Sequence, residues 1–259
     1  MNSQHLESIE DNPSFSGDIR LYSHSGLCNR LRLIAEYKHL SDTRDKAIEM
    51  FWVKSPQCNR VFDDLFKPIP NINFHHLKWK RDARQMRPKN TAQRLGLFPH
   101  DEEIKNKNHL IFRPVDSIMK TIENVKNMIG DDYISCHIRR TDIVTIQNKH
   151  KIEPPTNKFF EDFIDKYPRH KVLLATDNRN TQIEFSKKFG SRLYLSTIVN
   201  GNGNKRWPKR TTSIPNAVTD LFLCIGSHDF IGTTCSSFST FIENYRKGMV
   251  CHKKTPNNN

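Results

Sequence analysis

Two consecutive arginines, Arg139 and Arg140, offer the clearest anion-binding chemistry in the sequence. They stand at the end of the apolar, alternating stretch 133–138, and Asp142 follows closely. A guanidinium group keeps its charge and binds phosphate oxygens in pairs, so it can stabilise a departing diphosphate. Strand alternation places His137 and Arg139 on one side, and we expect the arginine pair to face a crevice at the strand's end. A surface arginine pair neutralised by Asp142 would explain the same residues without a ligand.

Three other junctions between a predicted strand and a predicted helix carry small or polar residues. A glycine at such a junction lets the backbone approach a ligand, and the start of the helix presents N–H groups to an anion. The candidate ligand-binding residues there are Gly26, Asn29 and Arg30 in the turn 25–32, Thr176 and Asp177 in the stretch 172–178, and Asp220, Thr234, Ser236 and Ser237 in the stretch 219–237. Because ligands collect at the carboxyl ends of strands in open α/β sheets, these junctions predict one common site.

Each junction also has an explanation that needs no ligand. The turn after Gly26 suits an ordinary link between a strand and a helix. Asp177 suits the cap of the helix that follows it, and Ser236 or Ser237 suits the cap of the next one. Asp220 would then lie on the exposed face of its helix.

The elements that position these residues follow an alternating pattern. Strands are predicted over 18–23, 48–53, 71–77, 133–138, 171–175, 192–195 and 228–231. Helices are predicted over 31–39, 116–128, 159–167, 181–189, 217–225 and 239–247. Such alternation is typical of an α/β protein with parallel sheets. The charged stretch 78–107 has no clear period, so we expect a surface excursion with at most one helix.

We expect two lobes between polar ends. Residues 1–17 have the composition of a flexible leader, and residues 253–259 that of a flexible tail. A proline at position 114 interrupts the pattern of elements. The predicted boundary therefore separates an N-terminal lobe over 18–115 from a C-terminal lobe over 116–252.

The composition narrows the kinds of partner. The 259 residues are 36% hydrophobic, which suffices for a packed core, and carry a formal net charge of +13. That charge favours anionic partners, or it is a generally basic surface. We expect no nucleic-acid partner, because the sequence lacks an aromatic-rich RNA-binding strand, a helix-turn-helix and a zinc-finger spacing.

The cysteines and the chain's first residues predict a cytoplasmic protein. The six cysteines form no C-x-x-C pair, which favours reduced, mostly buried thiols over a disulfide or zinc framework. The first 17 residues lack an apolar signal-peptide core, and no stretch is apolar enough to span a membrane.

Taken in order, the four junctions resemble the fucosyltransferase superfamily of GT-B fold, which includes core α1,6-fucosyltransferases, nodulation fucosyltransferases and, more distantly, protein O-fucosyltransferases. His137 and the stretch 139–142 are similar to that family's His-x-Arg-Arg-Thr-Asp motif. The stretch 174–177 resembles its second motif, and residues 220–237 resemble its third, a helix followed by a Thr-x-Ser-Ser loop. The turn 26–31 is similar to its glycine-rich turn. The resemblance implies two Rossmann-like lobes, with the acceptor side in the first and the donor site in the second.

The resemblance also implies roles for individual residues. Arg139 would contact the diphosphate of GDP-fucose beside His137, Arg140 and Asp142 would shape the sugar pocket, and Asp220 would bind the guanine. Ser236 and Ser237 would meet phosphate or ribose. The catalytic residues would be Arg139, Arg140 and Asp142, in an inverting transfer that needs no metal and no cofactor.

Two departures from the family's pattern concern the acceptor side. Ile143 and Gln147 replace a lysine and a glutamate that serve the acceptor and the general base in core fucosyltransferases. Neither side chain can take a proton from a hydroxyl, so Glu153 and Asp142 become the candidate bases.

The short chain suits a bacterial-type or viral enzyme with a nucleotide-sugar donor and a glycan acceptor. The departures keep open a catalytically silent module that binds a sugar nucleotide or a glycan, and leave the acceptor, linkage and oligomeric state undetermined.

Overall fold

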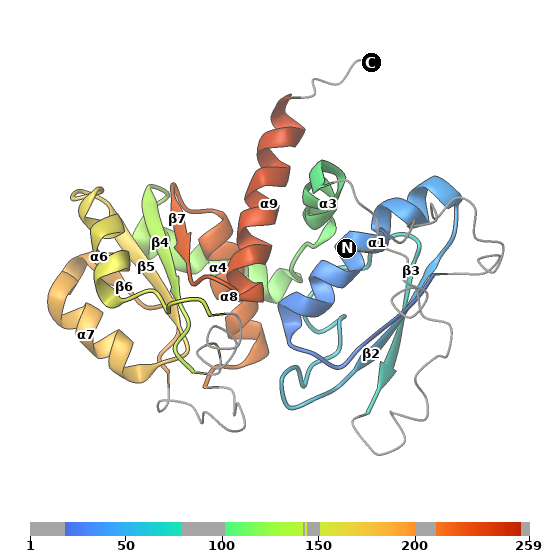
Figure 1. Ribbon diagram of the computed structural model, residues 1–259, viewed down its shortest axis with the longest axis horizontal. Coiled ribbons are helices and arrows are strands. Elements are labelled where there is room, and N and C mark those ends of the chain that lie inside the picture. The colour runs from blue at the N-terminus through green and yellow to red at the C-terminus, as the bar shows by residue number, and fades with distance from the viewer. Residues whose placement is uncertain (1–18, 79–101, 142, 144–150, 200–210, 255–259) are drawn as a thin grey trace.

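The computed structural model describes residues 19–78, 102–141, 143, 151–199 and 211–254. These residues form two parallel β-sheets with helices between and around them (Figure 1). The predicted leader, most of the charged excursion, Asp142 and Gln147 lie outside the described residues.

The first sheet contains the strands of the N-terminal part. Its order is β1 (Ile19–Ser23), β2 (Ile48–Val53) and β3 (Ile72–Leu77), with β2 central and all pairs parallel. Helix α1 (Leu27–Arg44) connects β1 to β2. It begins four residues before the predicted helix, directly after Gly26.

The second sheet has the order β6 (Leu193–Tyr194), β5 (Lys171–Thr176), β4 (Tyr133–Ile138) and β7 (Phe230–Gly232), again all parallel. Its helices are α4 (Asp116–Ile129), α6 (Asn157–Asp165), α7 (Arg179–Phe189) and α8 (Ile214–Ile225). Short 3-10 turns cover His109–Ile111 and Gly190–Arg192. The parallel pairing brings the carboxyl ends of β5, β4 and β7 to one edge of the sheet.

Helices cover both faces of the second sheet. On one face Ile134, Cys136 and Ile138 pack with residues of α6 and α7. On the other, Tyr133 and Leu173 belong to a larger cluster that includes residues of α4 and α8. Because successive side chains of a strand point to opposite faces, the two clusters share β4 and β5 without sharing residues.

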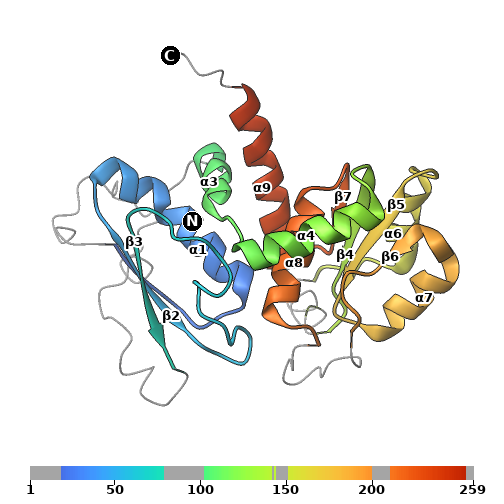
Figure 2. The same ribbon diagram turned by 180° about the vertical axis from the view of Figure 1, so that it is seen from behind.

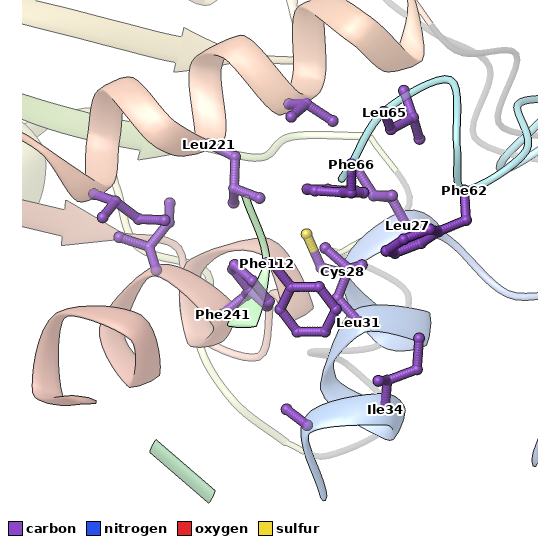
Figure 3. Close-up of a cluster of buried hydrophobic side chains, with 14 of the residues drawn as sticks. Leu27, Cys28, Leu31, Ile34, Phe62, Leu65, Phe66, Phe112, Leu221 and Phe241 are labelled. Atoms are coloured by element: carbon purple, nitrogen blue, oxygen red, sulfur yellow. The ribbon is translucent and has the colours of Figure 1, made fainter. Parts of the chain in front are cut away.

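One continuous core joins the two sheets. Leu27 and Leu31 of α1 belong to the same buried cluster as Leu221 of α8 and Phe241 of the last helix, with Phe112 among them (Figure 3). Helices α4 and α8 lie next to each other in both views, between the sheets (Figures 1 and 2). The division into lobes at residues 115 and 252 stays a prediction.

The last helix crosses from the second sheet to the first. Helix α9 (Ser237–Lys254) begins beside β7 and packs along α3 (Glu102–Asn108) and α1. It extends seven residues beyond its predicted end at 247. An ideal Cβ added to Gly248 would lie 2.3 Å from the carbonyl oxygen of Asn106, so glycine is what allows this close crossing.

The prediction of an α/β protein with parallel sheets is confirmed. No disulfide joins the six cysteines, all of which lie in the described part of the chain, and Cys28, Cys58, Cys136 and Cys224 are buried as expected. Within the described residues no helix combines the length and apolarity needed to span a membrane.

Candidate functional site

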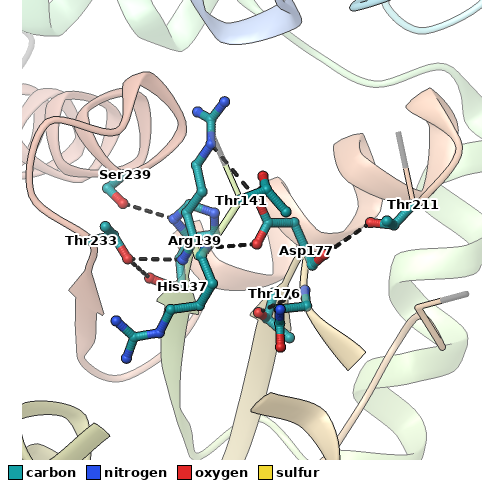
Figure 4. A network of polar contacts seen from close by, with 10 residues as sticks. His137, Arg139, Thr141, Thr176, Asp177, Thr211, Thr233 and Ser239 are labelled. Carbon is teal, nitrogen blue, oxygen red and sulfur yellow. Dashed lines mark hydrogen bonds and ion pairs between the residues drawn. The ribbon is translucent and has the colours of Figure 1, made fainter. Parts of the chain in front are cut away.

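The loop that follows β4 is held by the loop that follows β7. The backbone N–H of Arg139 donates to the hydroxyl of Thr233 at 2.9 Å, and that hydroxyl donates to the carbonyl of His137 at 3.1 Å. The backbone N–H of Thr233 also donates to this carbonyl, at 3.0 Å. Thr233 is 1% exposed. Residues 139–141, the Arg139 loop, are therefore held at their start against the edge of the sheet (Figure 4).

Asp177, directly after β5, holds all three residues of the same loop, 139–141. Its carboxylate accepts the backbone N–H of Arg140 at 2.8 Å and the hydroxyl of Thr141 at 2.5 Å, and lies 4.0 Å from Nε of Arg139. The cap of α7 is the neighbouring Asn178, whose side chain accepts the N–H of Thr181. The explanation of Asp177 as a simple helix cap is therefore wrong.

The two arginines diverge. The guanidinium of Arg140 donates to the carbonyl of Pro155 and, at 2.7 Å, to the side chain of Asn157, and lies 5.7 Å above the ring of Phe160. Burial lowers the pKa of Arg140. The guanidinium of Arg139 lies instead on the Asp177 side. The expectation that both groups face one crevice is corrected, because the guanidinium of Arg140 is bound by Pro155, just before α6, and by Asn157, at its start.

His137 faces the interior, where α9 begins. Its Nδ1 lies 2.8 Å from the hydroxyl of Ser239, and its ring packs on Phe238 with centroids 4.5 Å apart. Burial, with a smaller contribution from the charge of Arg139, lowers the pKa of His137 to about 3. The ring is neutral at physiological pH, so the positive charge at this end of β4 comes from arginine.

A close backbone approach brings Ser239 to His137. An ideal Cβ on Gly232 would lie 2.5 Å from the Cβ of Ser239, so only glycine fits at the end of β7. Cys235, three residues on, has a φ of 64°, a strained conformation for a residue with a side chain. The sequence analysis did not identify Gly232 or Ser239 as functional residues. The signal that could have identified them is a glycine directly before a run of small residues.

The start of α9 carries an unsatisfied buried hydroxyl. The Oγ of Ser236 has no hydrogen-bond partner in the described part of the chain, although the residue is fully buried. The idea that Ser236 simply caps α9 through its hydroxyl is therefore not what the structure has. Ser237 is half-buried and Thr234 is exposed beside it. Backbone N–H groups at the start of a long helix attract anions.

Asp220 is a buried carboxyl group on α8, only 6% exposed. The idea that it lies on an exposed face is wrong. Its carboxylate accepts the hydroxyl of Ser196, in the segment after β6. Burial raises the pKa of Asp220 to about 7, and the hydrogen bond from Ser196 counteracts this only in part. The group therefore changes charge near neutral pH.

The predicted residues of the first turn separate into two kinds. Gly26 has ordinary backbone angles, an added Cβ would meet nothing within 4 Å, and Asn29 is exposed one turn into the helix. Arg30 is fully buried: it donates to the carbonyl of Ser25 at 2.7 Å and to the hydroxyl of Ser55 at 3.0 Å, and lies 4.6 Å above the ring of Trp52. Burial lowers its pKa to about 10. Packing therefore leaves Gly26 and Asn29 accessible and uses Arg30 inside the fold.

The remaining predicted residues are Thr176, expected on the donor side, and the residues expected on the acceptor side. Thr176 is buried, and its hydroxyl accepts the N–H of Asn178 at 3.3 Å. Ile143, in the place of the family's lysine, is 1% exposed and packs in the interior. Glu153 is exposed. Asp142 and Gln147 lie outside the described residues, so no geometry bears on them.

Together these contacts hold residues 139–141, which carry two arginines, at the carboxyl edge of the second sheet. Arg139 is oriented by Asp177 and Thr233, and the start of α9 carries the unsatisfied hydroxyl of Ser236 on the loop that follows the neighbouring strand. Such a combination is suited to phosphate oxygens, which accept both charged and backbone donors.

Comparisons with known proteins bear on the fold. No family model matches the sequence, and no curated protein matches it. Solved structures do match. The NodZ α-1,6-fucosyltransferase co-crystallised with GDP has a TM-score of 0.59 at 12% identity, over 88% of this chain and 91% of that one. The fucosyltransferase NodZ from Bradyrhizobium has a TM-score of 0.55 at 12% identity, over 87% and 91%. The apo form of POFUT1 has a TM-score of 0.57 at 9% identity, over 89% and 95%. The chain therefore has the α/β fold of these fucosyltransferase structures.

Proposed function

We propose that this chain is a glycosyltransferase that transfers fucose from GDP-fucose to a glycan acceptor. The observation that carries the proposal is the Arg139 loop, fixed by Asp177 and Thr233 at the carboxyl edge of the second sheet. The overall fold matches that of NodZ, whose crystals have been soaked with GDP-fucose and grown with GDP. A donor anion at this edge would meet Arg139 and the start of α9.

On the donor side, the diphosphate would lie between the guanidinium of Arg139 and the first N–H groups of α9. The unsatisfied hydroxyl of Ser236 supports this placement, because a buried donor without a partner costs free energy that a phosphate oxygen would recover. When the bond to the sugar breaks, negative charge grows on the diphosphate. A fixed guanidinium stabilises that charge without reorganisation and without a metal.

The guanine would be bound through Asp220. An ionised carboxylate accepts two hydrogen bonds side by side, and the guanine edge offers two such donors. In the described structure the hydroxyl of Ser196 occupies this carboxylate, so the base would displace Ser196. Gly26 and Asn29, which packing leaves accessible, would approach the donor from the first sheet.

The acceptor side would depend on different residues from those of core fucosyltransferases. A buried Ile143 neither binds an acceptor nor takes a proton. Asp142 and Glu153 are the proposed candidates for the general base, which removes the acceptor's proton while the anomeric carbon inverts. A chain that bound the donor and never turned it over would instead be the sugar-nucleotide-binding module.

Thermal unfolding with GDP and with UDP tests the proposal. We expect GDP to raise the melting temperature and UDP not to, since guanine offers Asp220 two adjacent donors and uracil offers only one. Because the pKa of Asp220 is about 7, its carboxylate forms between pH 6 and pH 8, and the GDP shift should increase over that range.

Asp220→Asn is the matched control for this measurement. The substitution removes the carboxyl group that titrates, so the part of the pH dependence that Asp220 causes should disappear. The part caused by titration of the phosphate of GDP should remain. Equal shifts with GDP and UDP would argue against a guanine nucleotide donor. Donor hydrolysis, measured as GDP released from GDP-fucose, then separates an enzyme from a binding module.

A further inference from the structure

Three side chains that could bind a metal ion come together away from the Arg139 loop. Nε2 of His170 lies 3.2 Å from Oδ1 of Asp132, and Nδ1 of His228 lies 3.6 Å from the same oxygen. All three candidate ligand atoms lie within 4.8 Å of one another. The two imidazole rings have centroids 5.2 Å apart.

The cluster lies at the amino edge of the second sheet. Asp132 directly precedes β4, His170 directly precedes β5, and His228 comes two residues before β7. The backbone N–H of His228 donates to the carbonyl of Tyr133 at 2.7 Å, which keeps the third residue level with the start of β4. Strands of six residues span about 20 Å, so the cluster and the Arg139 loop occupy opposite edges.

The loops that carry the two histidines are fixed by their own contacts. The ring of Tyr167 packs nearly perpendicular to the rings of His170 and His228, and its hydroxyl donates to Asp229 at 2.6 Å. The guanidinium of Arg246 on α9 donates to the carbonyls of Ser227 at 2.6 Å and His228 at 3.0 Å. The rings are therefore held in place by contacts other than those with Asp132.

We propose that Asp132, His170 and His228 bind one divalent transition-metal ion, with zinc the best match. Two imidazole nitrogens and one carboxylate oxygen are a donor set that zinc accepts, at about 2.0–2.2 Å from each atom. Around a tetrahedral ion, such ligand atoms lie about 3.3 Å from one another, close to the separations from Asp132 found here. Small side-chain rotations would complete the geometry, with water as the fourth ligand.

The ion would act on the fold and not on sugar transfer. It would join three loops that are distant in the chain, which restricts the unfolded state and stabilises the second sheet at its amino edge. This departs from the expectation, drawn from the sequence, that the protein uses no metal. The proposal does not rest on the proposed function, because the two sites lie at opposite ends of the strands.

Metal binding by the full chain, free of any purification tag and treated with EDTA, tests the proposal. Equilibrium dialysis against zinc should give one ion per chain, and cobalt at the same site should show the visible absorption of a tetrahedral complex. Zinc should also raise the melting temperature. Asp132→Asn should weaken zinc binding about tenfold or more, and its fold is expected to survive because the Asp132 side chain is 75% exposed.

Two further variants make the result specific. His170→Ala should weaken zinc binding as Asp132→Asn does, whereas His39→Ala, which removes a half-buried histidine on α1, should leave it unchanged. Wild-type protein that binds no zinc, or that loses none of its affinity in Asp132→Asn, would overturn the proposal. The increase in melting temperature that GDP causes in Asp132→Asn, measured in parallel, reports on the nucleotide site separately.

Discussion

Arg139 is the side chain whose charge the proposed reaction needs most. Arg139→Lys keeps the charge and loses the planar fork, so stabilisation of the leaving diphosphate should decrease. We expect donor hydrolysis to fall about 10²–10³-fold, which corresponds to about 3–4 kcal/mol. The melting temperature should stay near that of the wild type, because Arg139 lies at a strand end and contributes little to the core.

Arg140→Lys is the matched control for Arg139→Lys. The guanidinium of Arg140 is held by Pro155 and Asn157 above Phe160. The substitution should therefore lower the melting temperature and have little effect on the rate of donor hydrolysis. An Arg139→Lys variant that melts normally and hydrolyses GDP-fucose at the wild-type rate would remove Arg139 from the mechanism. A variant that loses both activity and fold would give the residue a structural role.

Neighbouring residues at the end of β5 should behave differently from one another. Asp177→Asn keeps an acceptor for the N–H of Arg140 but removes the negative charge that orients the guanidinium of Arg139. Donor hydrolysis should therefore fall about tenfold, which corresponds to about 1.4 kcal/mol. Asn178→Ala removes the cap of α7 and should cost about 1 kcal/mol of stability without changing hydrolysis. Rate assays and urea unfolding of both variants check this. Equal effects on the rate would contradict the role given to Asp177.

At the scale of elements, periodicity predicted the strands and helices well and their contacts poorly. Strand β4 has its predicted bounds, because its alternation is strong and it is buried on both faces. Helix α9 was predicted too short, because its last turns pack on α3, a partner that no local pattern reveals. The divergence of Arg139 from Arg140 depends on Pro155, and the cluster at Asp132 depends on the sheet order. Neither follows from spacing along the chain.

The crossing of α9 over α3 depends on one glycine. Gly248→Ala would place a Cβ 2.3 Å from the carbonyl oxygen of Asn106, which cannot move without shifting α3. Overpacking costs about 1–3 kcal/mol, and the gain in helix propensity offsets about 1 kcal/mol of it. We expect a net loss of up to about 2 kcal/mol in the free energy of unfolding. Gly226→Ala is the control: its nearest contact is 3.4 Å, and it should be close to neutral.

At the scale of the whole molecule, the two proposed sites lie at opposite edges of the second sheet, separated by the length of its strands. The carboxyl edge carries Arg139 and the start of α9, and the amino edge carries the cluster of Asp132, His170 and His228. The core that contains Leu27 and Phe241 links the first sheet to the second, so the accessible Gly26 turn stays fixed relative to the sheet that bears Arg139. Because the two edges are a strand's length apart, we expect that a ligand can be removed from one edge without disturbing the other.

The last prediction uses this separation. If arginine stabilises the departing diphosphate, millimolar EDTA should leave donor hydrolysis within about twofold of its value without EDTA, since only the amino edge would lose an ion. The measurement is GDP release at a temperature well below the melting transition, so that loss of a stabilising metal cannot unfold the enzyme. Asp132→Asn serves as the control, because its weakened zinc binding should make its melting temperature less sensitive to EDTA than that of the wild type. Hydrolysis that stops in EDTA and returns with manganese would show that a metal takes part in the transfer, and the mechanism based on Arg139 would be wrong.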